Sequence, residues 1–278
     1  MIRKAVEEDA KIIVDINIKG WQNTYKDIFP RDFLNNLDKL KEESIVRCQK
    51  KISEYIVYEE NDKILGFVKY GINKKGFTNK YGEIYAIYVD SNYQGRSVGS
   101  KLLKETLKRL EKDFDYVLVS TLIQNSANEF YIKKGFTLIG KSKFNIEGES
   151  FDENLYCKSL SDLCHQMKLQ PEYYNYILNG TKKIELRLND EKRKNIKIGD
   201  KIKFLKEPEL QESFMATVIN LYKCDSFDEL FKHFDISLLA DKNMTKEKLI
   251  CDLEKFYTKE KQRKYGVIGI EISLESKK

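Results

Sequence analysis

Six consecutive residues, Gln94-Gly95-Arg96-Ser97-Val98-Gly99, have the composition of a phosphate-binding loop. Its glycines let the main chain approach an anion closely, and a turn into a helix leaves several backbone N–H groups unpaired. Because the helix dipole also favours negative charge at that end, the hexamer predicts a site for a phosphate or diphosphate. Taken alone, it would also suit an ordinary strand-to-helix turn.

Two predicted elements flank the loop and would hold it in place. The run 84–89 is apolar or aromatic throughout, which predicts a strand covered on both faces. After the loop, apolar residues recur at helical spacing and predict a helix: Val98, Leu102, Leu103, Leu107 and Leu110. A strand, a glycine-containing loop and a helix in this order favour the phosphate site.

The loop resembles the Q/R-x-x-G-x-G/A pyrophosphate loop of the GNAT N-acetyltransferases. A second segment, residues 125–136, resembles that family's N-x-x-A-x-x-F-Y-x-x-x-G-F motif. The family usually opens with a short strand and an Asp-led helix, and the sequence predicts these at 2–5 and 9–18. A Trp and a Tyr follow the helix, as in one subgroup of the family. The resemblance covers residues 1–160, which we take as the first domain.

This resemblance implies an α/β (α+β) fold with a mixed central sheet flanked by helices, and acetyl-CoA as cosubstrate for an amine acceptor. Ser97 stands where the family most often has glycine, and since serine resists positive φ, we expect it to bear on phosphate affinity. The residues implied for acetyl-CoA binding are Ile87, Tyr88, Val89, Gln94, Gly95, Arg96, Ser97, Val98, Gly99, Ser100 and Asn125.

Two side chains are implied for catalysis. Tyr131 matches the family tyrosine that protonates the departing thiolate, and a phenol is protonated at neutral pH. Glu83 stands where many GNAT enzymes have an acidic residue that removes the amine proton through water. The alternatives are a core tyrosine packed beside Phe130 and an exposed glutamate at the start of a strand.

A second domain is predicted over residues 166–278. It begins with a strand at 167–169 and a helix that starts at Pro171 and stops at Gly180, and a turn at Gly199-Asp200 follows. Between them, Lys183, Glu185 and Arg187 alternate with apolar residues, which predicts a strand with one charged and one buried face.

The pattern Gly180-x-Lys182-x-x-Glu185-x-Arg187, the later Gly-Asp turn and a closing strand at 265–272 resemble the ASCH domains of the PUA-like superfamily. The resemblance implies a small PUA-like β-barrel with helices, and a cleft for RNA, a nucleoside or another small polar ligand lined by Lys182, Glu185 and Arg187. The alternative is that these side chains form the solvated face of a strand and pair with one another.

Some ASCH proteins hydrolyse an acetylated cytidine with the motif's lysine, a threonine and a glutamate. Here Lys182 is present, Glu185 replaces the threonine, and Lys242 takes the place expected for the glutamate. A cation cannot serve as the carboxylate base, so the sequence argues against this activity. The alternative is that Asp241, one residue away, takes the place of the glutamate.

Composition narrows the class of protein. The chain has 278 residues, 41% hydrophobic and 34% charged, as expected for about two globular domains. It has no apolar stretch of the length that crosses a membrane and no apolar signal core near residue 1, so we expect a cytoplasmic protein. The odd number of cysteines and two histidines show no metal-ligand spacing, so we expect reduced thiols and no metal.

Charge gives little support for a strong polyanion binder. The pI is about 8.8, and both parts of the chain are nearly balanced when it is divided at residue 164. The basic runs 192–194 and 259–264 fit solvated surface better than a phosphate contact. The leading hypothesis is an N-acetyltransferase with an appended ligand-binding domain. The alternative is an RNA- or ligand-binding protein whose first domain only senses acetyl-CoA or is degenerate.

Overall fold

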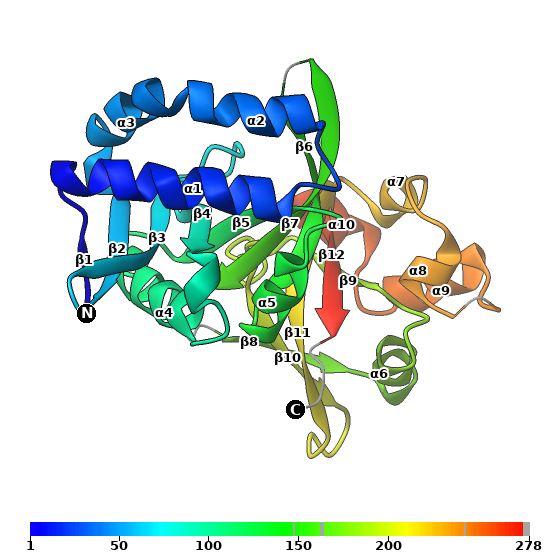
Figure 1. Cartoon of the computed structure of the whole chain (residues 1–278). Coiled ribbons are helices and arrows are strands. Elements are labelled where there is room, and N and C mark those ends of the chain that lie inside the picture. The colour runs from blue at the N-terminus through cyan, green and yellow to red at the C-terminus, as the bar shows by residue number, and fades with distance from the viewer. Residues whose placement is uncertain (147, 162–163, 242, 275–278) are drawn as a thin grey trace. The chain divides into compact units, whose positions relative to one another are not determined.

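The computed structural model describes residues 1–146, 148–161, 164–241 and 243–274. The chain divides into two compact units (Figure 1). One comprises Met1–Phe136 and Lys141–Ser161, and the other comprises Thr137–Gly140 and Asp162–Lys278.

The N-terminal unit is built on a seven-stranded mixed sheet with the strand order β1-β2-β3-β4-β5-β7-β6. All neighbouring pairs with a described register are antiparallel except β4 with β5, which is parallel. The strands are β1 (Ile2–Lys4), β2 (Tyr55–Glu60), β3 (Lys63–Ile72), β4 (Tyr81–Val89), β5 (Tyr116–Leu122), β6 (Thr137–Ile146) and β7 (Glu149–Ser159).

Helices cover both faces of this sheet. In Figure 1, α1, α2 and α3 lie over one face, while α4 and α5 lie over the other. The helices are α1 (Ala10–Thr24), α2 (Arg31–Lys39), α3 (Lys41–Gln49), α4 (Val98–Leu110) and α5 (Ala127–Lys133), with short 3-10 turns at Glu7–Asp9, Ile52–Glu54 and Ser91–Tyr93.

Alternation along β2 shows how the sequence builds these two layers. Ile56 and Tyr58 pack in the cluster that contains the apolar face of α4, whereas Tyr55 and Val57 pack in the cluster that contains α1. Successive side chains of a strand point to opposite faces, so a strand between two helical layers must be apolar on both sides. The mixed sheet flanked by helices confirms the predicted fold class of the first domain.

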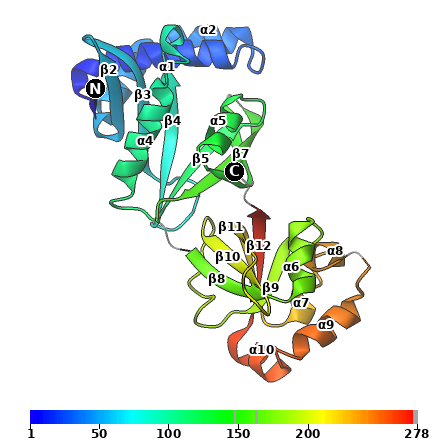
Figure 2. The same cartoon turned by 90° about the horizontal axis from the view of Figure 1, so that it is seen from below.

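The C-terminal unit contains a five-stranded sheet with the strand order β8-β10-β11-β12-β9. The sheet is curled into a half-barrel (Figure 2). Among the described strand pairs of this sheet, β8 with β10 is parallel and the others are antiparallel. The strands are β8 (Cys164–Leu169), β9 (Ile184–Leu188), β10 (Lys201–Lys206), β11 (Ser213–Cys224) and β12 (Val267–Leu274).

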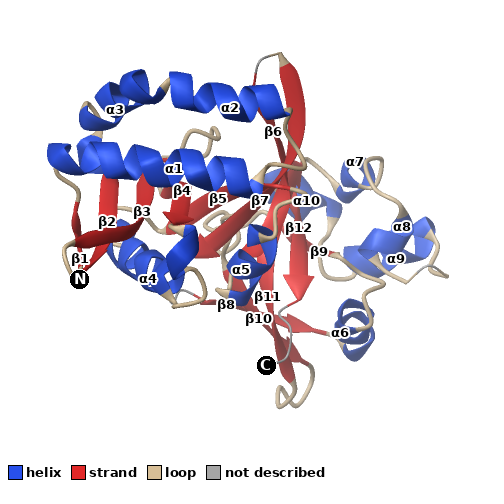
Figure 3. Cartoon of the chain, viewed as in Figure 1, coloured by secondary structure: helices blue, strands red, loops and turns tan. Residues whose placement is uncertain are grey.

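Five helices accompany this sheet (Figure 3), among the residues that are described in the C-terminal unit. They are α6 (Pro171–Leu178), α7 (Phe227–Leu230), α8 (Ile236–Leu239), α9 (Lys246–Glu254) and α10 (Lys259–Tyr265). The predicted start of α6 at Pro171 is confirmed, and Gly180 has φ +80°, which explains a glycine after the helix. Gly199, at φ +94°, forms the predicted turn before β10.

Within the described ranges, we find no helix with the length and hydropathy that crossing a bilayer requires.

Candidate functional site

The N-terminal sheet opens at its centre, where β4 and β5 stop pairing. The parallel register runs only from Tyr81 to Ile84 on β4, opposite 116–119 on β5. β4 nevertheless continues to Val89 and β5 to Leu122. The carboxyl ends of the two strands therefore diverge.

A β-bulge lies at the start of this divergence. In the register of β3 with β4, Ala86 and Ile84 face consecutive residues of β3, so that Tyr85 is the extra residue. Bulges bend and twist a strand and often occur beside active sites. The run 85–89 is half-buried rather than covered on both faces, which corrects the expectation from its apolar composition. Its side chains line cavities.

One cavity, of about 410 Å³, lies between the diverging strands and the start of α5. Its lining includes seven of the residues that the sequence singled out: Ile87, Tyr88, Val89, Gln94, Gly99, Asn125 and Tyr131. The other predicted residues of the loop, Gly95, Arg96, Ser97, Val98 and Ser100, continue from Gln94 into the first turn of α4.

The backbone of residues 94–100 has features that suit a diphosphate. No described residue accepts a hydrogen bond from the backbone N–H groups of this segment. Gly95 has φ +77°, and a Cβ there would meet nothing within 4 Å, so the main chain is open to an approaching group. Ser97, the N-cap of α4, has φ +61° and ψ 11°. The donors and the helix dipole together suit an anion.

Not every side chain of the loop is free to bind. Val98 is 3% exposed and packs in the core with α4, so only its backbone faces a ligand. Arg96 donates from Nη2 to Glu60 Oε1 at 2.8 Å. Gln94 donates from Nε2 to the carbonyl of Val89 at 3.3 Å, which ties the loop to the end of β4.

Tyr131 is 3% exposed and belongs to a group of phenols at the edge of the 410 Å³ cavity. Burial, and then the neighbouring Tyr25, raise the pKa of Tyr131 well above its usual range. Burial also raises the pKa of Tyr88, which interacts with Tyr25. Asn125 donates from Nδ2 to the Tyr25 hydroxyl at 3.1 Å. All three phenols are therefore protonated at neutral pH.

Glu83 is 6% exposed, and its carboxylate accepts a 2.6 Å hydrogen bond from the backbone N–H of Lys74. Burial raises the pKa of Glu83, against the opposing effects of that hydrogen bond and of Lys75. It is not an exposed residue at the start of β4. Nor is it among the residues that line the two cavities of the N-terminal unit.

A second cavity in this unit, of about 520 Å³, shares one wall with the first. Ser120, on β5, lines both, and its buried Oγ has no hydrogen-bond partner among the described residues. A ligand that crosses the junction could supply that partner. The residues common to both cavities are Tyr25, Tyr85, Ala86, Tyr88, Ser120 and Thr121.

Several of these junction residues are not assigned to a site by the sequence. The sequence marks Trp21 and Tyr25 only as a family feature, yet Trp21 lines the second cavity and Tyr25 lines both. Glu153, on β7, also lines the second cavity, and is held by Lys75 Nζ at 3.0 Å and Ser142 Oγ at 3.0 Å. No local pattern in the sequence marks a carboxylate on a late strand as a neighbour of β4.

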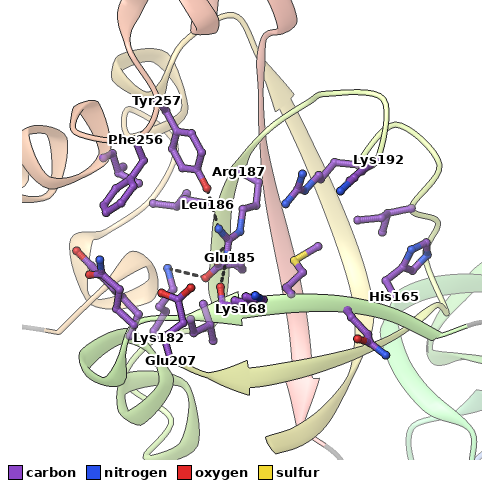
Figure 4. A pocket seen from close by; sticks show the side chains of 18 of the residues that line it. His165, Lys168, Lys182, Glu185, Leu186, Arg187, Lys192, Glu207, Phe256 and Tyr257 are labelled. Carbon is purple, nitrogen blue, oxygen red and sulfur yellow. Dashed lines mark hydrogen bonds and ion pairs between the residues drawn. The ribbon is translucent and has the colours of Figure 1, made fainter. Parts of the chain in front are cut away.

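The C-terminal unit has its own cavity, of about 790 Å³ (Figure 4). Lys182, Glu185 and Arg187 all line it, as the sequence predicted. Aromatic and apolar side chains form much of the remaining wall, and further polar residues join from β8 and from the loop after β9. They include His165, Lys168, Tyr173, Leu186, Lys192, Arg193, Leu253, Phe256 and Tyr257.

The Lys-Glu-Arg group forms one connected network. Glu185 faces Lys182 Nζ at 3.5 Å with one oxygen and Arg187 Nε at 2.9 Å with the other (Figure 4). Lys182 also donates to the carbonyls of Ile184 and Leu239, each at 2.7 Å. Burial lowers the pKa of Lys182, although Glu185 opposes this. Lys182 therefore ties the start of β9 to the end of α8, and its contact with Glu185 is the longest of the three.

Arg187 already has protein partners at both ends of its guanidinium. Nη1 donates to the Tyr257 hydroxyl and Nη2 to the Lys168 carbonyl, each at 2.7 Å (Figure 4). A guanidinium carries five N–H donors, so Nη1 and Nη2 each retain one for a ligand. Arg187 is thus held in a fixed orientation at the cavity wall.

The apolar face of β9 is buried as expected, but its charged face is largely covered as well. Glu185 is only 4% exposed and Lys182 only 3%, and Arg187 is held against Tyr257 and the Lys168 carbonyl of β8. The solvated-face alternative does not fit this burial. Lys242, whose identity argued against acetylcytidine hydrolysis, lies outside the described residues, and Asp241 accepts a hydrogen bond from the backbone of Asn243.

Comparison with known proteins gives two matching family models. Residues 51–138 match the acetyltransferase (GNAT) domain, and residues 167–276 match the ASCH domain. The "Uncharacterized N-acetyltransferase YuaI" of Bacillus subtilis (strain 168) is 27% identical over 153 residues, which are 55% of this chain and 88% of that protein.

Similar solved structures include the PaiA N-acetyltransferase from Thermoplasma acidophilum in complex with coenzyme A. It is 22% identical, with a TM-score of 0.43, and the match covers 55% of this chain and 96% of that one. The structure of YncA from Salmonella typhimurium with its cofactor acetyl-CoA is 21% identical, with a TM-score of 0.45 and coverage of 59% and 95%.

The first family model falls almost wholly within the N-terminal unit and the second within the C-terminal unit. The sheet that opens between β4 and β5 lies in the first, and the Lys-Glu-Arg network lies in the second. The chain therefore carries a GNAT acetyltransferase domain at residues 51–138 and an ASCH domain at residues 167–276.

Proposed function

We propose that the N-terminal unit transfers an acetyl group from acetyl-CoA to an amine. The observation that carries this proposal is the meeting of two cavities where β4 and β5 diverge, with the glycine-containing loop at the end of one. Acetyl-CoA would occupy the cavity beside the loop, and the amine would enter from the other. The thioester and the amine would then meet at the shared wall.

Each part of the first cavity has a role in this reaction. The backbone N–H groups of 94–100 bind the diphosphate of acetyl-CoA. Asn125, already bonded to Tyr25, lies beside the arm that leads to the thioester. The edge of β4 at 87–89, which has no partner on the β5 side among the described strand pairs, offers backbone groups to the thioester carbonyl.

Tyr131 would donate the proton that the departing thiolate needs. Its raised pKa keeps the phenol protonated, and its position on α5 places it in the cavity wall. The amine attacks the carbonyl carbon, the C–S bond breaks, and the sulfur takes the phenolic proton. A general acid of this kind contributes about 10²- to 10⁴-fold to a rate.

The acceptor ammonium must lose a proton before attack, and Glu83 is the proposed base. Because its carboxylate is outside the cavity lining, it would act through a water molecule. Glu153, which lines the acceptor cavity, is a second candidate for the same step. Both carboxylates lie close to Lys75, which links the two positions.

The test is Tyr131→Phe. We expect the rate of CoA thiol release to fall by about 10²-fold or more with little change in acetyl-CoA affinity, because the proton is needed only as the thiolate leaves. Tyr156→Phe is the matched control, since this buried tyrosine stacks on Tyr131 but its hydroxyl donates to Asn128 instead of facing a cavity. Equal rates for wild type and Tyr131→Phe would remove the acid role from Tyr131.

A second candidate function is acetyl-CoA sensing without transfer. Ser97 favours it, because a serine held at φ +61° is strained and weakens the case for a tight diphosphate site. Thiol release in the presence of amines separates the two functions, since a sensor binds acetyl-CoA without consuming it.

For the ASCH domain, we propose that RNA, a nucleoside or another small polar ligand binds the 790 Å³ cavity. Its volume falls in the range of about 300–1,000 Å³ that is usual for small-molecule sites. The aromatic rings of Tyr173, Phe256 and Tyr257 suit a planar base, and the remaining donors of Arg187 suit its edge or a phosphate.

Binding of short RNAs and nucleosides to the full chain tests this role. We expect Arg187→Lys to weaken binding by about tenfold or more. Lysine cannot keep the Tyr257 and Lys168 contacts and also offer two parallel N–H donors to a ligand. Lys183→Ala, a change at the exposed neighbour, is the control. If no ligand distinguishes the two variants, the cavity has no recognition role.

The acceptor's identity and the cytoplasmic location remain predictions.

A further inference from the structure

The chemistry of the acceptor can be inferred from the second cavity of the N-terminal unit. This cavity lies under α1 and α3 and against β3 and β4, and its lining combines aromatic rings with basic side chains. The basic residues are Arg47, Lys50, Lys51 and Lys69. The aromatic residues are Trp21, Tyr25, Tyr55, Phe67, Tyr85, Tyr88 and Phe144.

Little negative charge opposes these cations. Glu153 is the carboxylate in the described lining, and it is already held by Lys75. Lys50 and Lys51 have no carboxylate within 4.0 Å among the described residues, and Arg47 donates to the hydroxyl of Ser44. The cavity therefore has a surplus of positive charge at the end formed by α3 and β3.

Lys69 is the basic residue placed furthest into this wall. It is one of the half-buried lysines, with 23% of its side chain exposed, and its nearest carboxylate, Glu54, is 3.6 Å away. Burial lowers the pKa of Lys69; Glu54 opposes this, and the positive charges of Lys74 and then Lys51 add to it. Holding two cations near one another is unfavourable unless an anion joins them.

The position of three cations at the end of α3 also has a simpler explanation. Basic residues there complement the helix dipole, an effect of about 0.3–1 kcal/mol at exposed sites. Lys69 is on β3, however, and gains nothing from that helix end. Its half-buried place in the cavity wall near Lys51, with Glu54 as the carboxylate at 3.6 Å, is the observation that the dipole does not explain.

An aromatic wall lies at the junction of the two cavities. Trp21 and Tyr25 are 4.9 Å apart between ring centroids, and Phe144 packs 6.0 Å from Trp21. These rings belong to a cluster that continues to Phe29 and Phe33, so they are held rigidly. An apolar part of the acceptor would lie against them, between the basic end and the thioester.

We propose that the acceptor is a small amine that also carries an anionic group, bound by Lys69 and Lys51, with an apolar or aromatic portion against Trp21. The proposal rests on the proposed acetyl transfer and names its substrate class. The anionic group is a carboxylate or a phosphate, and both would meet the same cations. An acidic acceptor would also be drawn toward the basic end of the cavity before it reacts.

The test compares matched amines in a thiol-release assay on the full chain with acetyl-CoA. Each acidic amine is paired with its neutral counterpart: phenylalanine with phenylethylamine, tryptophan with tryptamine, and phosphoethanolamine with ethanolamine. We expect kcat/KM to be about 10-fold or more higher for the acidic member of at least one pair, as a charge-assisted contact implies. The carboxylate and phosphate pairs distinguish the two sources of charge.

Lys69→Gln identifies the residue responsible. We expect it to raise the KM of the preferred acidic acceptor by about tenfold or more, to leave the neutral counterpart unchanged, and to leave acetyl-CoA affinity unchanged. Lys63→Gln is the matched control, because Lys63 is an exposed lysine on the same strand that does not line the cavity. Lys51→Gln should reproduce the effect of Lys69→Gln in part.

The outcomes separate this inference from the function on which it rests. If neutral amines are acetylated as well as acidic ones, and Lys69→Gln does not discriminate between them, the anionic acceptor is wrong while acetyl transfer stands. If wild-type protein releases no thiol with any amine of either kind although it binds acetyl-CoA, acetyl transfer itself fails.

Discussion

At the scale of single residues, Ser97 is the position where local strain and function conflict. Its backbone lies in the left-handed region, at φ +61° and ψ 11°, at the N-cap of α4. A side chain with a Cβ disfavours this region by about 1–2 kcal/mol, whereas glycine adopts it freely. Because the backbone of residue 97 lies at positive φ, a glycine at this position should tighten phosphate binding by the loop.

Ser97→Gly should therefore stabilise the N-terminal unit by about 1 kcal/mol and tighten acetyl-CoA binding by up to about fivefold. Ser100→Gly is the control, because residue 100 lies in the first turn of α4, where glycine costs about 0.5–1 kcal/mol. Thermal unfolding and calorimetric titration measure the two effects. Weaker binding by Ser97→Gly would mean that the serine hydroxyl itself contacts the ligand.

Glu83 gives a second prediction at this scale, through pH. Burial raises its pKa in the folded state above 4.5, its ordinary value, so the folded protein binds more protons than the unfolded chain in the window above 4.5. The contribution of Glu83 to stability must therefore fall as pH rises through that window, by at most about 1.4 kcal/mol per pH unit. Glu83→Gln keeps an acceptor for Lys74 and cannot ionise.

We expect Glu83→Gln to lose less stability than wild type as the pH is raised from 4.5 to neutral, in chemical denaturation at a series of pH values. Its acetyl-transfer rate should nevertheless fall, most at low pH, where the amine is most protonated. Glu42→Gln, on the exposed side of α3, controls for the loss of one charge. A variant with unchanged rates at every pH would shift the base role to Glu153.

At the scale of elements, the approach of α1 to β4 shapes the junction of the two cavities. Gly20 lies within α1, and a Cβ built there would overlap Cδ1 of Tyr88 and lie 2.8 Å from its Cε1. The helix can lie this close to β4 only because residue 20 has no side chain. Tyr88 is one of the phenols that the two cavities share.

Gly20→Ala should therefore destabilise the protein by about 1–3 kcal/mol, although the same change in an exposed helix would stabilise it. Displacement of Tyr88 should also reduce kcat/KM for acetyl transfer by about tenfold or more. Gly140→Ala is the control, since a Cβ at residue 140 meets nothing within 4 Å. An unchanged melting temperature for Gly20→Ala would show that α1 shifts away from β4 at little cost.

Gly20 also shows what the sequence could and could not predict about the elements. The predicted helix at 9–18 is too short, because α1 continues through Gly20 to Thr24. Local propensity treats a glycine as a helix end, whereas here the glycine serves a tertiary contact. By contrast, the helix after the phosphate loop was predicted with both ends, since its apolar spacing and its loop agree.

The candidate site was predictable only where it is local in sequence. The loop and the residues after Asn125 each form one short motif, so their side chains could be named before the fold was known. Glu153 and Lys69 reach the acceptor cavity from strands that are distant in sequence, and the sheet order alone brings them together. The orientation of Arg187 depends likewise on Tyr257, 70 residues later in the sequence.

At the scale of the whole molecule, the chain has separate cores. The described hydrophobic clusters of the N-terminal unit gather around α1, α4 and the aromatic residues near Trp21. Those of the C-terminal unit gather around its curled sheet and around α7–α9. A unit with its own core can in principle unfold by itself.

We therefore expect differential scanning calorimetry to resolve two unfolding transitions. Acetyl-CoA should raise the melting temperature of only one of them. At about one hundred times its Kd, a ligand adds about 2.7 kcal/mol to the free energy of unfolding of the unit that binds it. This raises the melting temperature of that unit by about 5–10 °C. Tyr257→Phe, which removes a contact of Arg187, should lower the other transition. A single transition that moves as a whole would mean that the two units unfold together.

The most direct test of acetyl transfer is a single-turnover experiment on the full chain. Protein in excess over acetyl-CoA is mixed with the preferred amine, and CoA thiol and acetylated product are followed together by mass spectrometry. We predict that one thiol and one acetyl-amine appear per acetyl-CoA, at a rate lowered by Tyr131→Phe but not by Tyr156→Phe. Acetyl-CoA that binds and remains intact with every amine would contradict acetyl transfer and leave the N-terminal unit as a sensor.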